Sequence, residues 1–443
     1  MSRHPLRVLL LSYYYPPAPE VGGVRPARLA QFLADRGHEV HVLTLARSPD
    51  EAGTVRISER LSVHRVQAWR SPRGMVRSLG EGAPARNGDG GVGSVAAGSP
   101  ARAGRLRQLR SAVLSALWIP DDKQGFIGAA VSYGAELIAR HSIDVVYMTG
   151  PPWSVHVAGG LLARFGRRTL VAEYRDPWSP RLEAADLNHP AAVGMKRWLQ
   201  ERSLRRADVV VTVTDGIADY VRRFASTPLP FITALNGMAR LGSAVPAAPR
   251  SGPLQIVHAG EIYYGRDPGP FLQAVAAVAR RRQLGAEDLR IEFLGKGRFY
   301  RGVSIAGLAE DLGIGSIVSF RDQVPVDECR QILAEADALL LLAQRQPMQV
   351  PNKLYDYLAA ARPILAFVDG DGESERILRR LAGHEVVTDW TGPGAEAAVA
   401  ALLDSARTRR LDPRAPALAE LLSERQFARL ADRIEAAVES REQ

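Results

Sequence analysis

The sequence has little lysine, a single cysteine and no apolar run of membrane-spanning length. Only four of its 57 basic residues are lysines, and the other 53 are arginines. The one cysteine, Cys329, excludes a disulfide framework and a cysteine-based metal site. Because no apolar run is long enough to span a bilayer, we expect a cytoplasmic protein, at most peripheral to a membrane.

The remaining composition is typical of a globular protein with more than one domain. The 443 residues are 46% apolar and 24% charged, with a net charge of +9. A basic chain suits nucleic acid, membrane or phosphate partners. The arginines are spread along the chain, however, which favours a high-GC bacterial genome over a nucleic-acid-binding surface.

Short, uniformly apolar segments alternate with helical patterns, which indicates parallel sheets covered by helices on both faces. The pattern stops at a Gly/Pro/Ala-rich stretch and then restarts, so the sequence predicts an α/β protein with two doubly wound, Rossmann-like domains. Strands are predicted over 7–12, 38–45, 144–149, 169–174, 208–214 and 230–235, and again over 254–260, 289–295, 316–320, 337–343 and 363–368.

The predicted domains are 1–236 and 254–425, joined by a linker over 237–253, and 426–443 is expected to be a helix that packs back on the first domain. Ligands of such sheets bind beyond the carboxyl ends of the strands, so we expect the active site in a cleft between the domains. A Gly/Ala/Arg-rich insertion over 72–106 has too few large side chains to offset its ordering entropy. It is either a passive disordered segment or a flap that touches the acceptor or a membrane.

Glycines follow the first strand of each predicted domain, where a helix N-terminus can bind an anion. Gly22 and Gly23 precede the first helix. In the second domain Gly260 ends the first strand and Arg266 precedes the helix, while Lys296 lies between two glycines after the next strand. Each turn alone is a weak signal for a phosphate.

The stretch "QVPNKLYDYLAAARPI" (349–364) keeps one of the few lysines, Lys353. Asn352 is expected to cap a helix over 353–361, which places Lys353 in a first turn that the helix dipole disfavours by about 0.3–1 kcal/mol. A bound anion would remove that conflict. Asp356 lies on the same helix face and could bind a pair of hydroxyls. A cation for phosphate beside a carboxylate for hydroxyls suits a sugar nucleotide.

The chain resembles the family 4 glycosyltransferases of the GT-B fold over nearly its whole length. The resemblance implies a UDP- or GDP-linked sugar donor held mainly by the second domain, and a small-molecule, glycan or lipid acceptor held mainly by the first. It also implies hexosyl or related glycosyl transfer with retention at the anomeric carbon, without a metal ion or other cofactor. The matching segments are "SYYYPPAPEVGGVRPARLAQFLADRGHEVHVLT", "TGPPWSVHVAG", "EYRDPWS", "ADVVVTVTDGIADYV", "NGM", "HAGEIYYGRDP" and "VPNKLYDYLAAARPI".

The resemblance also implies roles for residues. Catalytic positions are His156, Arg266 and Lys353, with a core or capping histidine as the alternative for His156. Donor-binding positions are Gly22, Gly23, Gly260, Arg266, Lys296, Phe320, Arg321, Met348, Asn352, Lys353, Leu354 and Asp356, and acceptor-binding positions are Tyr15, Glu20, Arg175, Asp176 and Trp178.

The chain departs from the family at Met348, where a glutamate often accompanies the carboxylate at the position of Asp356. Gln346, Gln349 or loop amides could replace that contact, and an unusual or deoxy sugar would fit the loss. Because of the missing carboxylate, a non-catalytic subunit that binds a sugar nucleotide remains an alternative function. A sugar-nucleotide epimerase and a phosphorylase also remain alternatives, because they share this fold.

Two sequence patterns imitate metal sites. "DGDGE" (369–373) follows a predicted strand and is expected to cap a helix, and "HEVHV" (38–42) is expected to be a strand rather than a zinc-binding helix. We therefore expect no metal site.

Overall fold

A computed structural model describes residues 4–69, 119–165, 168–178, 190–241, 251–263, 265–409, 411–412 and 415–442. The insertion predicted over 72–106 lies outside them. The chain divides into two compact units. The first comprises Met1–Thr212, Asp219–Ile232 and Leu430–Gln443, and the second comprises Val213–Ala218 and Thr233–Arg429.

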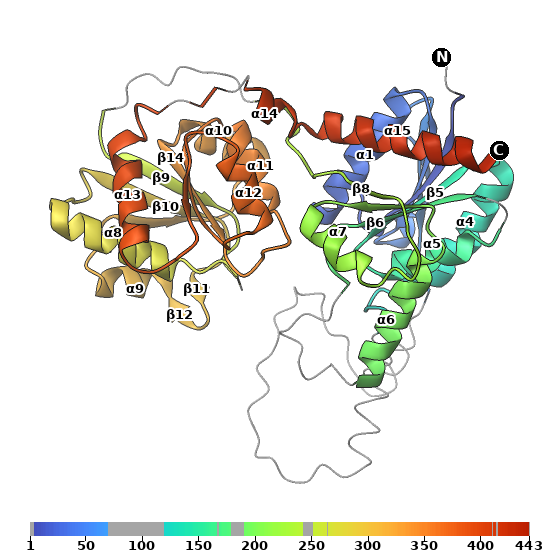
Figure 1. Cartoon of the computed structure of the whole chain (residues 1–443), viewed down its shortest axis with the longest axis horizontal. Coiled ribbons are helices and arrows are strands. Elements are labelled where there is room, and N and C mark those ends of the chain that lie inside the picture. Colours follow the sequence, from blue (N-terminus) through green and yellow to red (C-terminus); the bar gives the residue numbers. More distant parts are fainter. Residues whose placement is uncertain are drawn as a thin grey trace, which may run out of the picture. The chain divides into compact units, whose positions relative to one another are not determined.

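The first unit is built on an eight-stranded sheet in the order β3-β4-β2-β1-β5-β6-β7-β8 (Figure 1). The pairs from β4 through β7 are parallel, and β3 pairs with β4 in the antiparallel sense. The strands are β1 (Arg7–Leu11), β2 (Glu39–Leu45), β3 (Gly53–Arg56), β4 (Leu61–Val66), β5 (Val145–Gly150), β6 (Thr169–Tyr174), β7 (Val209–Thr212) and β8 (Phe231–Thr233).

Amphipathic helices cover this sheet. In α1 the residues Leu29, Ala30 and Leu33 are buried, as expected for a helix with one apolar face. The end of α15 is held by Arg36, which bonds Glu435 at 2.8 Å. The helices are η1 (Val21–Gly23), α1 (Val24–Asp35), η2 (Pro49–Glu51), α4 (Gly125–His141), α5 (Ser154–Leu162), α6 (Pro190–Leu204), α7 (Asp215–Arg222) and α15 (Ser423–Glu442).

The second unit has a six-stranded sheet in the order β13-β10-β9-β14-β15-β16, in which every pair is parallel. A short antiparallel hairpin, β11 with β12, stands apart from it. The strands are β9 (Leu254–Ala259), β10 (Leu289–Leu294), β11 (Phe299–Tyr300), β12 (Val303–Ser304), β13 (Val318–Arg321), β14 (Ala338–Ala343), β15 (Ile364–Val368) and β16 (Glu385–Val387).

Helices cover both faces of this second sheet, so alternate strand residues enter two different cores (Figure 1). Ile256 and Leu340 pack with the α8 side chain Phe271 in one core, whereas Val257 packs with the α11 side chain Leu354 in the other. The helices are α8 (Gly269–Arg282), α9 (Ile305–Asp311), α10 (Val326–Glu335), α11 (Asn352–Ala359), α12 (Glu373–Arg379), α13 (Pro393–Ser405) and α14 (Pro416–Ala419).

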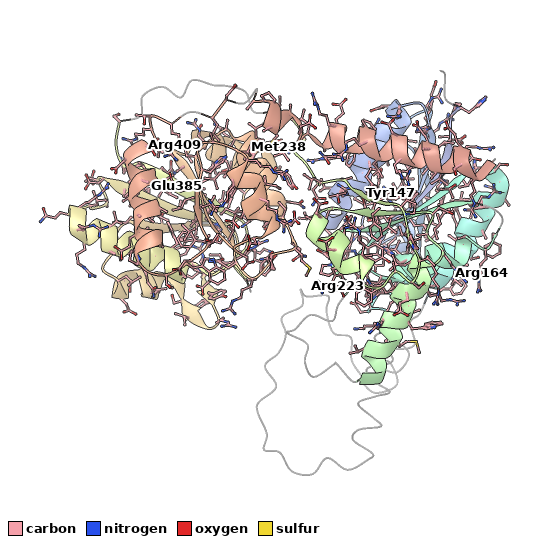
Figure 2. The ribbon with its side chains drawn as sticks, viewed as in Figure 1. Tyr147, Arg164, Arg223, Met238, Glu385 and Arg409 are labelled. Carbon is pink, nitrogen blue, oxygen red and sulfur yellow. The ribbon has the colours of Figure 1, made fainter. Side chains whose placement is uncertain are left out.

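Long-range contacts fix the ends of the second unit. The Met238 amide donates to the Leu421 carbonyl at 2.7 Å, and an Arg409–Glu385 ion pair of 2.7 Å holds the segment after α13 to β16 (Figure 2). Among the described residues, no helix is both long and apolar enough to cross a bilayer.

The α/β class with two doubly wound parallel sheets is confirmed. Five strands were not predicted. β3 is exposed along its whole length and β4 is only partly buried, so neither gives a uniformly apolar run. β16 is only three residues long, and β11 and β12 have two residues each. The second copy of the pattern begins at Leu254, as predicted.

Candidate active site

In the second sheet the strand order reverses at β9, which lies between β10 and β14. The chain leaves these strands in opposite directions, and such a switch point is where ligands of open parallel sheets bind. Gly260 follows β9 with φ +117°, and a Cβ there would lie only 3.0 Å from Nζ of Lys353. Glycine therefore lets the ammonium group of Lys353 lie directly against the backbone of this turn.

A buried histidine orients Lys353. The Nζ atom lies 3.2 Å from Nε2 of His258, whose Nδ1 is 2.9 Å from the Leu340 carbonyl oxygen. Since Nδ1 must donate to that carbonyl, Nε2 carries the lone pair that accepts from the ammonium group. Burial, and then the charge of Lys353, lower the pKa of His258 well below its ordinary value, so the ring is neutral.

This contact gives a reason for lysine at position 353. One rotatable ammonium group can donate to the imidazole of His258 and still present N–H groups elsewhere, whereas a planar guanidinium needs more room and a different geometry. His258 was not predicted, because it lies inside an otherwise apolar strand and gives no separate sequence signal.

Arg266 is the second cation at this turn. Its Nη1 donates to the Glu261 carbonyl at 2.9 Å, and its guanidinium carbon lies 4.1 Å from the ring centre of Tyr263. Among the described residues no group accepts from its buried Nε. Burial, and then the charge of Arg266, lower the pKa of Lys353 well below its ordinary value.

Within the described part of the chain, neither Lys353 nor Arg266 forms an ion pair with a carboxylate. Their partners are an imidazole, a carbonyl and an aromatic ring, all uncharged. Two partly buried cations without a counter-charge are unfavourable unless an anion binds. The two side chains therefore form a candidate anion site at this turn.

The next turn belongs to the same surface. Gly295 has φ +129°, and a Cβ there would lie 3.0 Å from the Gly260 carbonyl oxygen, so the two turns are packed backbone to backbone. Lys296 follows and is exposed. It adds a third positive charge at the carboxyl end of β10, as the sequence predicted.

The beginning of α11 differs from the prediction in two residues. The helix starts at Asn352 itself after Pro351, so Asn352 is not its cap, and its Oδ1 instead accepts from the Asn236 side chain at 2.8 Å. Leu354 is wholly buried in the core and its amide donates to the Pro351 carbonyl, so it offers no group to a donor. Asp356 is exposed one turn after Lys353, on the same helix face.

The aromatic group at the end of β13 includes Phe320, which stacks on Phe293 with ring centres 5.5 Å apart. The guanidinium of Arg298 lies 5.0 Å from the Phe320 ring centre. Arg321 is different from Arg266, because its Nε donates to the carboxylate of Glu292 at 2.7 Å and its charge is already paired. Phe320 can flank a flat base, while Arg321 mainly holds the strand edge.

The loop before α11 is held by backbone contacts and by a partly exposed carboxylate. The Met348 carbonyl accepts from Thr214 Oγ1 at 2.6 Å. Gln346 donates through Nε2 to the Gly265 carbonyl at 3.2 Å and through its amide to Asp369 at 2.6 Å. Asp369 therefore fixes this loop and does not cap α12, which corrects the predicted role of the Asp-x-Asp segment.

In the first unit the order reverses at β1, between β2 and β5, and the predicted glycine loop follows β1. A Cβ on Gly23 would lie 3.1 Å from the Tyr15 backbone, so any side chain there would press on the loop after β1. The Gly23 amide donates to the Glu20 carbonyl at 2.9 Å. That amide is used by the turn, which corrects the expectation that it faces a diphosphate.

Arg175 ties this glycine loop to the loop after β5. Its guanidinium donates to three backbone carbonyls, those of Gly22, Gly150 at 3.3 Å and Pro151 at 2.7 Å. Burial lowers the pKa of Arg175. Because most of its donors serve the protein, Arg175 is a positioning residue for Gly22 rather than the acceptor contact that was predicted.

The interior beneath these loops contains a charged network that the sequence did not reveal. The wholly buried carboxylate of Glu173 accepts from Arg25 Nε at 2.9 Å, Tyr147 Oη at 2.7 Å and Thr149 Oγ1 at 2.5 Å (Figure 2 labels Tyr147). Burial alone would raise the pKa of Glu173, but the Arg25 charge and these bonds lower it overall. The pair fixes the start of α1 below the glycine loop.

His156 is wholly buried beside this network. Its Nε2 lies 3.0 Å from the Glu173 carbonyl oxygen and its Nδ1 lies 3.4 Å from Ser203 Oγ, so both ring nitrogens have protein partners. Burial lowers its pKa to about 4. These surroundings are those of a core histidine, which was the alternative to a catalytic role.

Of the predicted acceptor residues, two are buried. Trp178 stacks on Trp153 with ring centres 4.8 Å apart, and Tyr15 is buried, which raises its pKa to about 12. Glu20 and Asp176 are partly exposed, and Glu20 lies 3.6 Å from Arg47. Of the predicted acceptor residues, these two therefore keep a partly exposed carboxylate.

Residues 22–237 match the family described as glycosyl transferase 4-like domain. No curated protein sequence matches the chain. Solved structures match it along nearly its whole length. Sucrose-phosphate synthase from Thermosynechococcus elongatus has a TM-score of 0.63 and 16% identity, with 98% of this chain and 100% of that chain covered.

Two similar structures contain a sugar nucleotide. A structure titled as trehalose-6-phosphate from E. coli, bound with UDP-2-fluoro glucose, has a TM-score of 0.62 and 11% identity and covers 97% of this chain and 99% of its own. HepE of Anabaena in complex with UDP-glucose has a TM-score of 0.58 and 13% identity, with coverages of 97% and 100%. At these identities the likeness shows the fold. The family match covers residues 22–237, a little under half of the chain. In that part of its sequence and in its fold, the chain is similar to the GT-B glycosyltransferases of the family 4 type.

Proposed function

We propose that the chain is a retaining glycosyltransferase that binds a nucleoside-diphosphate sugar through Lys353, Arg266 and the Gly260 turn and passes the sugar to a small-molecule, glycan or lipid acceptor. The observation that carries the proposal is the pair of cations without a carboxylate partner at the switch point of the second sheet. A diphosphate supplies the missing negative charge.

The proposed chemistry follows from where charge develops. When the bond between the sugar and the diphosphate breaks, negative charge grows on the leaving oxygen, and fixed cations stabilise it more in the transition state than in the ground state. Lys353, oriented by His258, and Arg266 would supply that stabilisation without a metal ion. In a retaining reaction the departing phosphate oxygen can accept the acceptor's proton on the same face.

The remaining donor contacts are proposed from position. We propose that Asp356, exposed one turn beyond Lys353, binds the ribose hydroxyls and that Phe320 flanks the base. The uridine nucleotides in two similar structures support a UDP-linked sugar, with GDP as the second choice. Met348 leaves one sugar contact without a carboxylate, which favours a deoxy or otherwise unusual sugar.

The proposal is tested by incubating the protein with UDP- and GDP-linked sugars, first by thermal shift and then by release of the free diphosphate. Slow donor hydrolysis that Lys353→Ala abolishes is the expected result, and the anomeric configuration of a transferred product would report retention. Appearance of an epimerised sugar nucleotide would instead indicate an epimerase. Tight binding without any turnover would indicate a non-catalytic subunit.

A further inference from the structure

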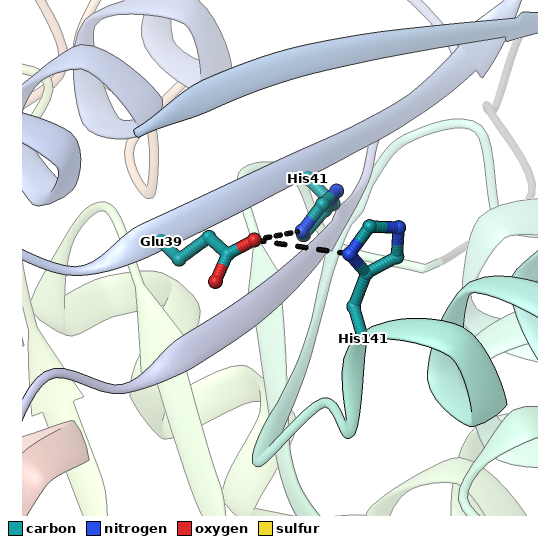
Figure 3. Close-up of side chains that lie close together, drawn as sticks. All are labelled: Glu39, His41 and His141. Atoms are coloured by element: carbon teal, nitrogen blue, oxygen red, sulfur yellow. Dashed lines mark hydrogen bonds and ion pairs between the residues drawn. The ribbon is translucent and has the colours of Figure 1, made fainter. Parts of the chain in front are cut away.

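A second group of side chains lies at the amino-terminal end of β2, at the opposite end of the strand from the glycine loops of the first sheet. Glu39 and His41 are on the same face of β2, and His141 is the last residue of α4 (Figure 3). His41 Nε2 lies 3.0 Å from Glu39 Oε1, and His141 Nδ1 lies 3.8 Å from the same oxygen. One ligand atom from each residue falls within 4.8 Å of the others.

These spacings suit a transition-metal ion. Ligand atoms bound at about 2.0–2.2 Å to a tetrahedral zinc ion are about 3.3–3.6 Å apart, and the observed separations bracket that range. Two imidazoles and a carboxylate are ligands that zinc and its neighbours prefer, whereas magnesium and calcium prefer oxygen alone. The donor set therefore selects the class of ion.

The second ring nitrogen of His41 is hydrogen-bonded to another side chain, as is usual for metal-binding histidines. Its Nδ1 lies 3.1 Å from Nε2 of His64, whose Nδ1 lies 2.8 Å from Thr54 Oγ1. Without an ion, Thr54 donates to His64, His64 to His41, and His41 Nε2–H to Glu39. With an ion on His41 Nε2, each ring carries its proton on Nδ1, so His41 donates to His64 and His64 to Thr54.

Both arrangements satisfy every ring nitrogen of His41 and His64 with the same number of protons. The side chain of His41 is 4% exposed, while those of Glu39 and His141 are 45% and 28% exposed. An ion can thus enter from solvent and keep a water molecule on its open side.

From this geometry we infer that Glu39, His41 and His141 bind one divalent ion of the zinc class. The ion would join the end of α4 to the start of β2, residues more than a hundred positions apart in the chain. Because the site is at the amino-terminal end of the strand, away from the glycine loops of the same sheet, its role is structural. Nearby cations do not occupy it, since Arg7 pairs with Asp144 and Arg140 with Glu136.

The test uses the tag-free full chain, stripped of metal by chelator and then titrated with Zn²⁺ or Co²⁺ by calorimetry. We expect one equivalent to bind, a visible Co²⁺ spectrum typical of a four-coordinate ion, and a raised thermal midpoint. His141→Ala should weaken binding by at least about tenfold. His64→Gln, which removes the support of the His41 ring, should weaken it by about 10–100-fold.

His4→Ala is the matched control, because His4 is exposed and lies outside the group. It should bind as the wild type does. If His141→Ala does not fold without metal, Glu39→Gln provides the same test at a half-exposed side chain and should also lose at least about tenfold. Wild-type protein that takes up no ion, or a His141→Ala variant that binds as tightly as wild type, would overturn the proposal.

Discussion

The two sheets both place arginine or lysine beside the turn where the strand order reverses, but only one of them neutralises the charge. In the first unit Arg25 forms an ion pair of 2.9 Å with Glu173, and the hydroxyl groups of Tyr147 and Thr149 donate hydrogen bonds to the same carboxylate. In the second unit Lys353 and Arg266 have uncharged partners within the described part of the chain.

The difference separates charges that hold the fold from charges that await a ligand. A buried pair with complete hydrogen bonding fixes the geometry of its surroundings, and removing one partner is costly. An unpaired, partly buried cation reduces the stability of the empty protein and strengthens the binding of an anion. Variants that remove a cation should therefore lower stability far more in the first unit than in the second.

The largest effect is expected for Arg25→Leu, which leaves the Glu173 carboxylate buried without its counter-charge. We expect the free energy of unfolding of the first unit to fall by about 3–5 kcal/mol, measured by urea denaturation. Arg197→Ala, which breaks an exposed pair with Glu201, is the control and should cost less than about 1 kcal/mol. Equal effects of the two variants would show that the buried network does not hold the unit.

Acid should destabilise the first unit through His156, whose pKa is lowered to about 4. Between pH 6.5 and 4 the unfolded chain binds a proton that the folded chain does not, so stability is lost as the pH falls through this window. One such histidine contributes a slope of about 1.4 kcal/mol per pH unit. Buried His258 and His384 shift in the same direction.

The measurement is the unfolding free energy between pH 7.5 and about 4.5, for wild type and His156→Gln. In the variant, the unfolding free energy should fall less steeply with decreasing pH, by the contribution of about one proton, and the rest of the pH dependence should remain. A slope identical to that of the wild type would mean that His156 is not held neutral in the folded protein.

In the second unit, Lys353→Met should change the stability of the ligand-free protein by no more than about 1 kcal/mol. The substitution removes repulsion from Arg266 and fills a similar volume, but it also removes the donor to His258 Nε2, so the two effects largely offset each other. Thermal unfolding without nucleotide measures the effect, with Lys296→Met as the exposed control. A loss of several kcal/mol would place Lys353 among the structural charges and abolish the contrast between the units.

The smallest effect is expected from chelator on turnover. If the two cations stabilise the leaving diphosphate, excess chelator should leave glycosyl transfer unchanged at temperatures where the protein is folded. A lower thermal midpoint in the same experiment would report loss of the ion from the proposed site of Glu39, His41 and His141. Activity lost in chelator and restored by magnesium or manganese would contradict the metal-independent reaction.

The uniformly apolar strands predicted the fold. The turn after the first strand of the second domain predicted Arg266 as a phosphate-binding residue, and the first turn of the helix after Asn352 predicted Lys353. It could not predict His258, because a buried strand residue gives no signal of the lysine that it orients from 95 positions away. Glu173 was missed for a related reason. A single acidic residue in an apolar strand acquires a role only when folding brings Arg25, 148 positions away, into contact.

The proposed metal site shows the same limit of prediction from the sequence. The sequence correctly placed Glu39 and His41 on a strand, and for that reason excluded a zinc helix. Alternate residues of a strand share one face, so the two could be paired from the sequence. The third member, His141, comes from the end of a distant helix and is visible only in the folded chain.

The central claim is that Lys353 binds a diphosphate, and calorimetry with uridine, UMP and UDP, or the guanosine series, tests it directly. Wild type should bind the diphosphate more tightly than the nucleoside. Lys353→Ala should weaken diphosphate binding by about 1.5–3 kcal/mol and leave nucleoside binding unchanged, with Lys353→Arg restoring only part of the loss. If Lys353→Ala binds the diphosphate as tightly as wild type, the cation pair is not the donor site.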